Sequence, residues 1–216
     1  MTKKGLAVLA SLLIALSAGL QAQFARTYGG PESDVPASIL TTPDGGFIVF
    51  GDSTSLPGRA WLMKLAGDGS VQWEKAYAED PSGTFRSACT TPEGGYLIGG
   101  GPNSNIWLIK TNSQGEAEWQ RSFVDNAAVL YAVYPSADSG YFVIGSTSAG
   151  GSNTDIWVMK ISPDGDQVWE KAYGLADTEM GITAAPTADG GCVIAGVATS
   201  SSQGRMIVFK IDSLGT

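Results

Sequence analysis

Three stretches near the start of the chain decide the fold: TTPDGGFIVFG (residues 41–51), WLMKLAGDG (61–69) and WEKAY (73–77). Asp-Gly or Gly-Gly between short apolar runs is a strong hairpin signal. In the last stretch large aromatic residues alternate with Glu and Ala, which is the period-two pattern of a strand with one buried face. The sequence therefore predicts four short strands joined by tight turns, over residues 37–42, 47–52, 60–65 and 71–77.

The same unit recurs three more times. TTPEGGYLIGG (90–100), PSADSGYFVIG (135–145) and PTADGGCVIAG (186–196) repeat the first stretch, and WLIKTNSQG (107–115), WVMKISPDG (157–165) and MIVFKIDSLG (206–215) repeat the second. The lysines of the second stretch fall at Lys64, Lys110, Lys160 and Lys210, in steps of 46, 50 and 50 residues. A repeat of this length built from short strands is typical of β-propellers. Residues 23–216 are therefore predicted to form an all-β propeller of four blades, each with four antiparallel strands.

The two ends of the chain suggest how the ring closes. The fourth repeat stops at Thr216, where its fourth strand should begin, and Phe24–Tyr28 matches the fourth-strand pattern, with Phe24 in place of Trp and Tyr28 in place of Tyr. An N-terminal strand that completes the last blade would remove the exposed sheet edges. Closure within one chain favours a monomer. The alternatives are a piece of a longer array and a dimer in which two chains share a larger ring.

Composition excludes several classes of function. The chain has no histidine, which excludes a Ser-His-Asp triad, a Cys-His pair and His-ligated zinc or haem. Without Lys3 and Lys4, 11 basic residues face 21 acidic ones, a net charge of −10. An acidic surface repels phosphate backbones, so nucleic acid is not expected as a partner.

Residues 1–22 have the pattern of a signal peptide. Lys3 and Lys4 precede an apolar run over residues 5–16, and small residues precede Gln23. The alternative, a membrane anchor, is less favoured because a span needs about 20 apolar residues. We expect an exported protein, secreted, periplasmic or at the cell surface, with no membrane span after removal of the signal peptide. Cys89 and Cys192 could pair in such a compartment, but their non-equivalent places in non-adjacent repeats favour two small buried residues.

The combination W-x-K-x-Y-G-G, D-G-G-[FY]-[IV]-[VI]-x-G and W-[LV]-[MI]-K resembles the repeats of secreted bacterial propeller proteins over the whole of residues 24–216. The resemblance implies a propeller and an exported location, and it brings no catalytic residue. Residues 162–169 are also similar to the Asp-box turn of propellers and to the tryptophan-docking repeats of quinone-dependent dehydrogenases, where such motifs tie hairpins together. A quinone cofactor is not expected here, because a four-blade ring leaves only a narrow channel.

Function is expected on the loops that vary between repeats. The loops after strands two and four emerge on one face, and those after strand four carry seven acidic residues without a lysine or arginine: Glu32, Asp34, Glu79, Asp80, Asp125, Asp177 and Glu179. Carboxylate oxygens suit calcium or a basic ligand, although no EF-hand spacing is present and a solvated acidic surface is the simpler interpretation. The loops after strand two are rich in Ser and Thr (53–55, 146–152 and 199–203) and could bind glycans, or simply connect strands.

These observations favour a non-enzymatic binding or scaffold module without a cofactor, acting on a protein or glycan through the loop face. The alternative is a propeller hydrolase or lyase that uses paired loop carboxylates such as Asp34 and Asp177. The evenly spaced lysines are expected to have a packing or pairing role in each blade and no catalytic role.

Overall fold

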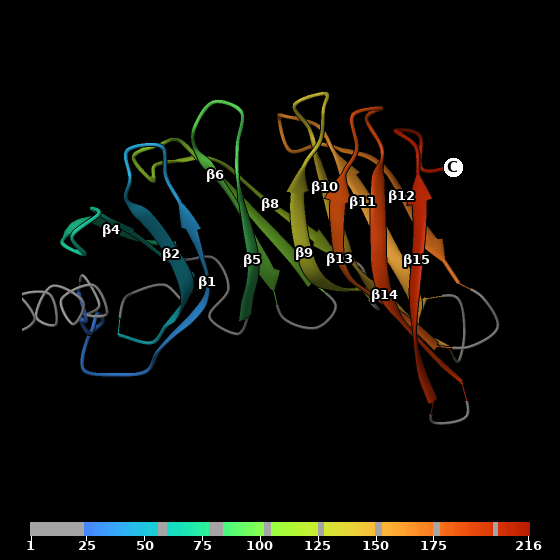
Figure 1. Ribbon diagram of the computed structural model, residues 1–216, viewed down its shortest axis with the longest axis horizontal. Helices are drawn as coiled ribbons and strands as arrows, with labels where there is room; N and C mark the ends of the chain where they lie inside the picture. The colour runs from blue at the N-terminus through green and yellow to red at the C-terminus, as the bar shows by residue number, and fades with distance from the viewer. Residues whose placement is uncertain are drawn as a thin grey trace, which may run out of the picture.

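The computed structural model describes residues 24–55, 60–77, 84–101, 105–124, 128–149, 153–174, 178–200 and 203–216. Over these ranges the chain is all-β, with 15 strands in four antiparallel sheets and no helix (Figure 1). Each sheet is one sequence repeat, so the predicted propeller architecture and strand pattern are confirmed. The predicted signal peptide, residues 1–22, lies outside the described residues.

Each blade is an antiparallel meander in which strands pair in chain order. Blade 1 contains β1 (Asp34–Thr41), β2 (Phe47–Ser53), β3 (Ala60–Leu65) and β4 (Val71–Tyr77). Blade 2 contains β5 (Thr84–Thr90), β6 (Tyr96–Gly101), β7 (Asn105–Thr111) and β8 (Ala117–Val124). Blade 3 contains β9 (Ala128–Pro135), β10 (Tyr141–Thr147), β11 (Asp155–Ile161) and β12 (Gln167–Tyr173). Blade 4 contains β13 (Thr178–Pro186), β14 (Cys192–Ser200) and β15 (Gln203–Ile211).

The glycines of the repeat are required by the turns. In blade 1 the amide of Gly45 donates to the Thr42 carbonyl over 3.0 Å, and Gly45 has φ of 77°. The turn between β3 and β4 has the same form, with Gly69 at φ 79°. A positive φ costs little for glycine alone, which is why this residue recurs at these turns.

The hydrophobic core lies between neighbouring blades. Ile48, Phe50 and Leu62 of blade 1 pack against blade 2, and equivalent side chains of blades 2 and 3 pack against the next blade along the chain. From blade 2 onwards the first strand of each blade lies against the preceding sheet, as β5 does against β1 and β2. The blades are therefore stacked side by side by apolar contact, and each of blades 1 to 3 buries one face against the next.

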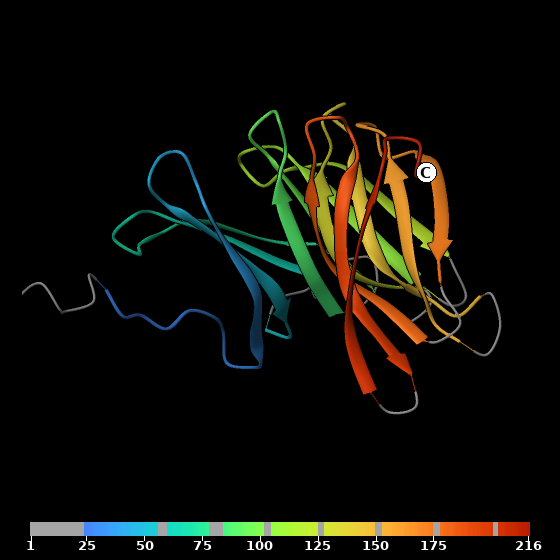
Figure 2. The same ribbon diagram turned by 45° about the vertical axis from the view of Figure 1, so that its right-hand side comes forward.

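The predicted closure of the ring by the N-terminal strand is wrong for this structure. Blade 4 has three strands, and residues 24–30 do not pair with β15. Figures 1 and 2 show an open arc, with blade 1 and blade 4 at opposite ends of the molecule. Residues 24–30 instead contact blade 1, where Tyr28 packs with Trp61 and Met63. The segment has the sequence pattern of a fourth strand, but residues 24–30 form no strand and pair with no sheet. The pattern contains no information on the angle between blades, which keeps the two ends apart.

Candidate functional site

The lysine of the first repeat is held in a polar cluster at the turn end of blade 1, the end that carries the tight turns between β1 and β2 and between β3 and β4. Lys64 Nζ donates to both carboxylate oxygens of Asp44 and to Thr42 Oγ1, each over 2.9 Å. The Thr42 hydroxyl and the Lys64 ammonium lower the pKa of the Asp44 carboxyl far below its usual range. Asp44 therefore stays ionised near neutral pH and cannot serve there as a proton donor.

Every blade contains an ion pair of this kind. Lys110 lies 3.2 Å from Glu118 and 3.6 Å from Glu93, Lys160 lies 2.6 Å from Asp138, and Lys210 contacts Asp189. The predicted pairing role of the periodic lysines is confirmed. Because each ammonium links the hairpin of strands one and two to strand three, the pairs brace the blade.

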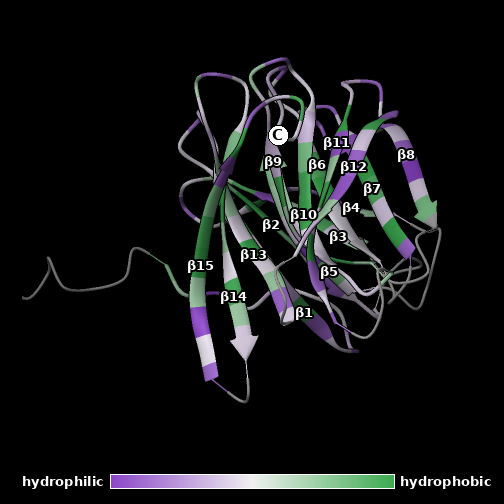
Figure 3. Ribbon diagram, turned by 90° about the vertical axis from the view of Figure 1, so that its right-hand side faces the viewer, coloured by the Kyte–Doolittle hydropathy of each residue, from purple (hydrophilic) through white to green (hydrophobic). Residues whose placement is uncertain are grey.

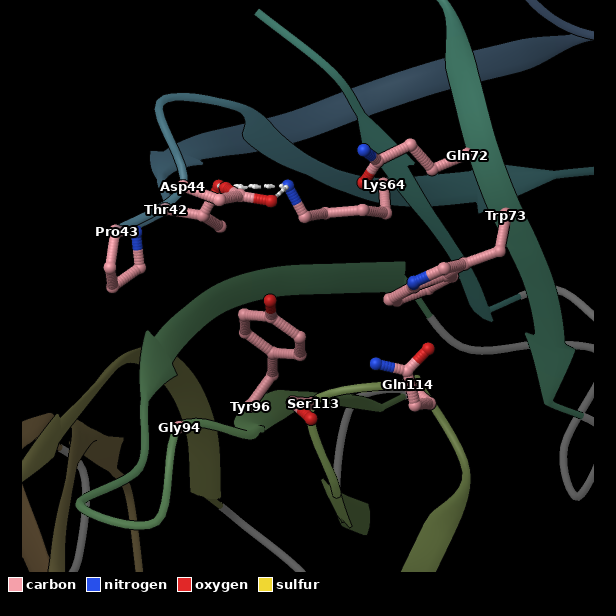
Figure 4. A pocket seen from close by; sticks show the side chains of 10 residues that line it. All are labelled: Thr42, Pro43, Asp44, Lys64, Gln72, Trp73, Gly94, Tyr96, Ser113 and Gln114. Atoms are coloured by element: carbon pink, nitrogen blue, oxygen red, sulfur yellow. Dashed lines mark hydrogen bonds and ion pairs between the residues drawn. The ribbon is translucent and has the colours of Figure 1, made fainter.

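A cavity of about 660 Å³ opens between blades 1 and 2 at this turn end (Figure 4). Its walls come from three turns and three strands of the two blades. The lining residues are Thr42, Pro43, Asp44, Lys64, Gln72, Trp73, Gly94, Tyr96, Ser113 and Gln114. The rings of Trp73 and Tyr96 lie 6.5 Å apart, tilted by 53°. A cavity of this size with two aromatic rings and a few polar groups fits a small ligand.

Trp73 differs from its counterparts in the later blades. Trp119 donates its indole N–H to the Pro163 carbonyl over 3.0 Å, and Trp169 donates to the Ser213 carbonyl over 3.1 Å. Within the described part of the chain, Trp73 Nε1 makes no such bond. Figure 4 shows this nitrogen on the edge of the ring that faces Tyr96 and Gln114. The indole N–H of Trp73 is therefore free to donate to a bound molecule.

Of the seven sequence-predicted acidic residues, the three that the structure describes lie outside this cavity. Glu32 and Asp34 belong to the segment before β1 and to its first residue, whereas Glu179 is buried at the start of β13, three blades away. Glu79, Asp80, Asp125 and Asp177 lie outside the described residues. In the ranges that are described, no group of three or more His, Cys, Asp and Glu side chains could hold a metal ion. The cation site therefore remains a prediction from the sequence.

The Ser-rich loop after β2 uses its hydroxyl groups within the protein. Ser55 Oγ accepts a hydrogen bond from the backbone amide of Glu32 over 3.0 Å and donates one to the Asp34 carboxylate over 3.2 Å. Thr54 Oγ1 accepts the Ser33 amide over 3.0 Å. Hydrogen bonds from Ser53, Gly30 and Ser55 outweigh desolvation and lower the pKa of the Asp34 carboxyl. This loop therefore fixes the start of β1. In the other two Ser- and Thr-rich loops, residues 150–152 and 201–202 lie outside the described residues.

The two cysteines are separate and buried, as the sequence analysis favoured. Cys89 lies in β5 and Cys192 in β14, and both are free thiols. Burial raises the pKa of Cys89 to about 12 and that of Cys192 to about 11. Neither thiol is therefore suited to act as a nucleophile near neutral pH.

The cavity residues were missed from sequence because they belong to the repeats and have structural roles there. The available signal was a departure from the repeat in two positions. Gln72 stands where the later repeats have Glu118 and Val168. Gln114 stands where the other repeats have Asp68, Asp164 and Leu214. These two amides face the same cavity, which only the packing of blade 1 on blade 2 reveals.

Comparison with known proteins supports the architecture alone. No protein-family profile and no curated protein matches the chain. Among solved structures, the endo-arabinase from Bacteroides thetaiotaomicron aligns with a TM-score of 0.51 at 13% identity, covering 88% of this chain and 79% of that one. A protein of unknown function from Bacteroides caccae aligns with a TM-score of 0.50 at 16% identity, covering 83% of this chain and 61% of that one. This chain thus spans less than two thirds of the second protein.

The described residues contain no helix that is long and apolar enough to cross a membrane.

Proposed function

We propose that the protein is an exported, non-enzymatic binding module, and that its cavity between blades 1 and 2 takes a neutral oligosaccharide. The observation that supports this most is the pairing of two aromatic rings with a free indole N–H in a cavity of about 660 Å³. Export rests on the signal-peptide pattern of residues 1–22 and on the resemblance of the repeats.

The chemistry of the cavity suits a sugar better than an ion. Its acidic side chain, Asp44, and its basic side chain, Lys64, neutralise each other, so the lining has no net charge. The remaining polar groups are amides and hydroxyls, which can donate to and accept from sugar hydroxyls. Trp73 and Tyr96 combine an apolar face with a polar edge, as a sugar ring does.

The same lining gives no support to the hydrolase or lyase alternative. Glycoside hydrolysis ordinarily needs two carboxyl groups, one of which must be able to hold a proton. The lining contains one carboxylate, Asp44, and its partners keep it ionised. The site also lies at the turn end of the blades, away from the loop face for which the sequence favoured function.

Titration of the full chain with neutral hexose and pentose oligosaccharides, followed by calorimetry and tryptophan fluorescence, tests the proposal. Gln114→Ala and Trp73→Phe should each weaken binding by about tenfold, a loss of about 1.4 kcal/mol. Asp164→Ala, at the equivalent turn position of blade 3, is the matched control and should bind normally. Binding that is unchanged in both test variants would place the site elsewhere, and release of shorter sugars would show an enzyme.

A further inference from the structure

Residues 24–28 hold the place of a fourth strand from a blade that would precede blade 1. Tyr28 Oη donates to the Gly69 carbonyl over 2.6 Å. The same bond joins the fourth strand of one blade to a turn of the next at two other junctions: from Tyr77 to Gly115 over 2.5 Å and from Tyr173 to Gly215 over 2.8 Å. The N-terminal segment thus docks on blade 1 as if another blade stood in front of it.

The aromatic ring of the segment is placed in the same way. A Cβ added to Gly69 would lie 2.6 Å from the ring of Phe24, and one added to Gly115 would lie 2.6 Å from the ring of Trp73. Arg26 lies close enough to Asp68 to lower its carboxyl pKa, after the stronger effect of Ser70. Phe24 and Tyr28 therefore make the contacts that Trp73 and Tyr77 of strand four make at the next junction.

Blade 4 has an unpaired strand edge at the other end of the arc. In blades 1 to 3 the third strand pairs on both sides, whereas β15 pairs with β14 alone among the described strands. Figure 3 looks at this end of the molecule and shows hydrophobic stretches along β15. An unpaired strand edge offers its free N–H and C=O groups to another strand.

The outer face of blade 4 is apolar and uncovered. Met206 is 82% exposed and Val208 is 56% exposed. At the equivalent positions the other blades have buried residues: Ala60, Ile106 and Ile156 for Met206, and Leu62, Leu108 and Val158 for Val208. Met206 also lines an apolar hollow of about 480 Å³ on this face, together with Ala195 and Val197. In each inner blade this face is covered by the first strand of the next blade.

Blade 1 exposes the side chain that would cover such a face. Ile39 is 58% exposed. Its equivalent in blade 3, Val133, is buried and lies against Gly99 of blade 2. The equivalent of Gly99 in blade 4 is Ala195, which lines the apolar hollow. The two ends of the arc are therefore complementary in their apolar surfaces, and the unpaired edge of β15 can accept a segment with the pattern of a fourth strand.

We propose that two copies of this chain join head to tail, each completing the other's blade 4. The N-terminal segment of one copy would pair with β15 of its partner, and Ile39 of that copy would enter the apolar hollow. Leu62 pairs with Lys75, Leu108 with Arg121 and Val158 with Lys171 in the other blades. The same register places Arg26 of one copy opposite Val208 of the other. Two such junctions, related by a two-fold axis, give a ring of eight blades with no free edge.

The partner is a second copy because the two complementary ends cannot meet within one chain in this arrangement. Residues 24–30 lie at the end of the arc formed by blade 1, and β15 lies at the other end (Figures 1 and 2). The interfaces within the chain repeat from blade to blade along the arc, and the junction between copies continues this repetition at its ends.

The first test is the native mass of the full chain, processed by the cell, by light scattering after gel filtration. We expect a dimer. Val208→Glu should convert it to a monomer with an unchanged β-sheet circular dichroism spectrum. Val168→Glu is the matched control, because Val168 is 59% exposed but lies on β12, outside the junction, and it should leave the dimer intact. A monomeric wild-type chain, a larger assembly, or a dimer that survives Val208→Glu would overturn the proposal.

A second test places the contact. Arg26→Cys and Val208→Cys chains are mixed in equal amounts and oxidised mildly, while the native thiols are buried. The mixture should give a cross-linked pair at twice the chain mass, and neither variant alone should do so. If the Arg26→Cys, Val208→Cys double variant cross-links only within single chains, the ring closes within one chain and the head-to-tail dimer is refuted.

Discussion

The hydroxyl group of Tyr28 donates a hydrogen bond to the backbone carbonyl of Gly69, with 2.6 Å between the two oxygens. The bond joins residues 41 positions apart and fixes the segment before β1 on the turn between β3 and β4. Bonds of this kind also join blade 1 to blade 2 and blade 3 to blade 4. One tyrosine hydroxyl and one glycine carbonyl thus add a hydrogen bond to the apolar packing at these two junctions.

Removing the hydroxyl at a buried junction should destabilise the protein measurably. Tyr77→Phe should lower the free energy of unfolding by about 1 to 2 kcal/mol, because the carbonyl of Gly115 loses its partner. Tyr28→Phe should cost less, since that site is half-buried. Urea denaturation measures both changes. Tyr131→Phe is the control, because its hydroxyl makes only a weak contact with Met180 Sδ at 3.9 Å. Equal losses of unfolding free energy in all three variants would show that the hydrogen bonds at the junctions add no stability of their own.

Burial should decide how much each periodic lysine contributes to stability. The side chain of Lys160 is 3% exposed and its ammonium lies 4.6 Å from the centre of the Phe142 ring, whereas that of Lys210 is 51% exposed. Lys160→Met should therefore lower the free energy of unfolding by about 1 to 3 kcal/mol. Lys210→Met should lower it by less than about 1 kcal/mol, as for other exposed ion pairs. A reversed order in thermal or urea unfolding would contradict this account.

Acid should weaken the turn clusters of blades 1 and 4. Hydrogen bonds from Thr42 and Lys64 lower the pKa of Asp44, and those from Lys210 and Thr187 lower the pKa of Asp189. Because the folded pKa lies below the unfolded value of about 4, this stabilisation is complete above about pH 4 and is lost as the pH falls further. The melting temperature, measured from about pH 7 downwards, should fall most steeply below about pH 4. The Asp44→Asn, Asp189→Asn double variant should show a shallower fall, and an identical slope would exclude these carboxyls as the cause.

Two turn glycines separate backbone strain from a steric clash. Gly94 has φ of 83° and a Cβ added there would meet nothing within 4 Å, whereas a Cβ on Gly115, with φ of 73°, would lie 2.6 Å from the Trp73 ring. Gly94→Ala should cost about 1 to 2 kcal/mol through the backbone alone. Gly115→Ala should cost about 1 to 3 kcal/mol more, because the indole ring must move. Similar losses for the two variants in urea denaturation would mean that Trp73 yields easily.

The cysteine thiols should react only after unfolding. Their burial and raised pKa values predict very slow modification by an aromatic disulfide reagent in the native protein. Two thiols per chain should become available in denaturant without a reductant. A chain that releases no thiol under these conditions would contain a disulfide that the structure does not have.

The sequence was informative wherever one repeat decides the outcome. Asp44-Gly45 required a tight turn, alternation required strands with one buried face, and the spacing of Lys64 and its three counterparts indicated a pair in each blade. These features depend on residues within a few positions of one another or within one sheet. The candidate site could not be predicted in the same way, because Trp73 and Gln114 face one cavity only when blade 1 packs on blade 2.

The sequence by itself determined the repeat, the strands of the four sheets, the turns and the likeness of Phe24–Tyr28 to the pattern of a fourth strand. The tertiary structure alone decided that this segment docks on blade 1 without reaching β15, that the arc stays open, and that the cavity lies at the end of the blades that carries the tight turns. The physical reason is that backbone hydrogen bonding and side-chain alternation are local, whereas the angle between blades is set by the summed packing of many apolar side chains. A small difference at each interface, added over four blades, separates an open arc from a closed ring.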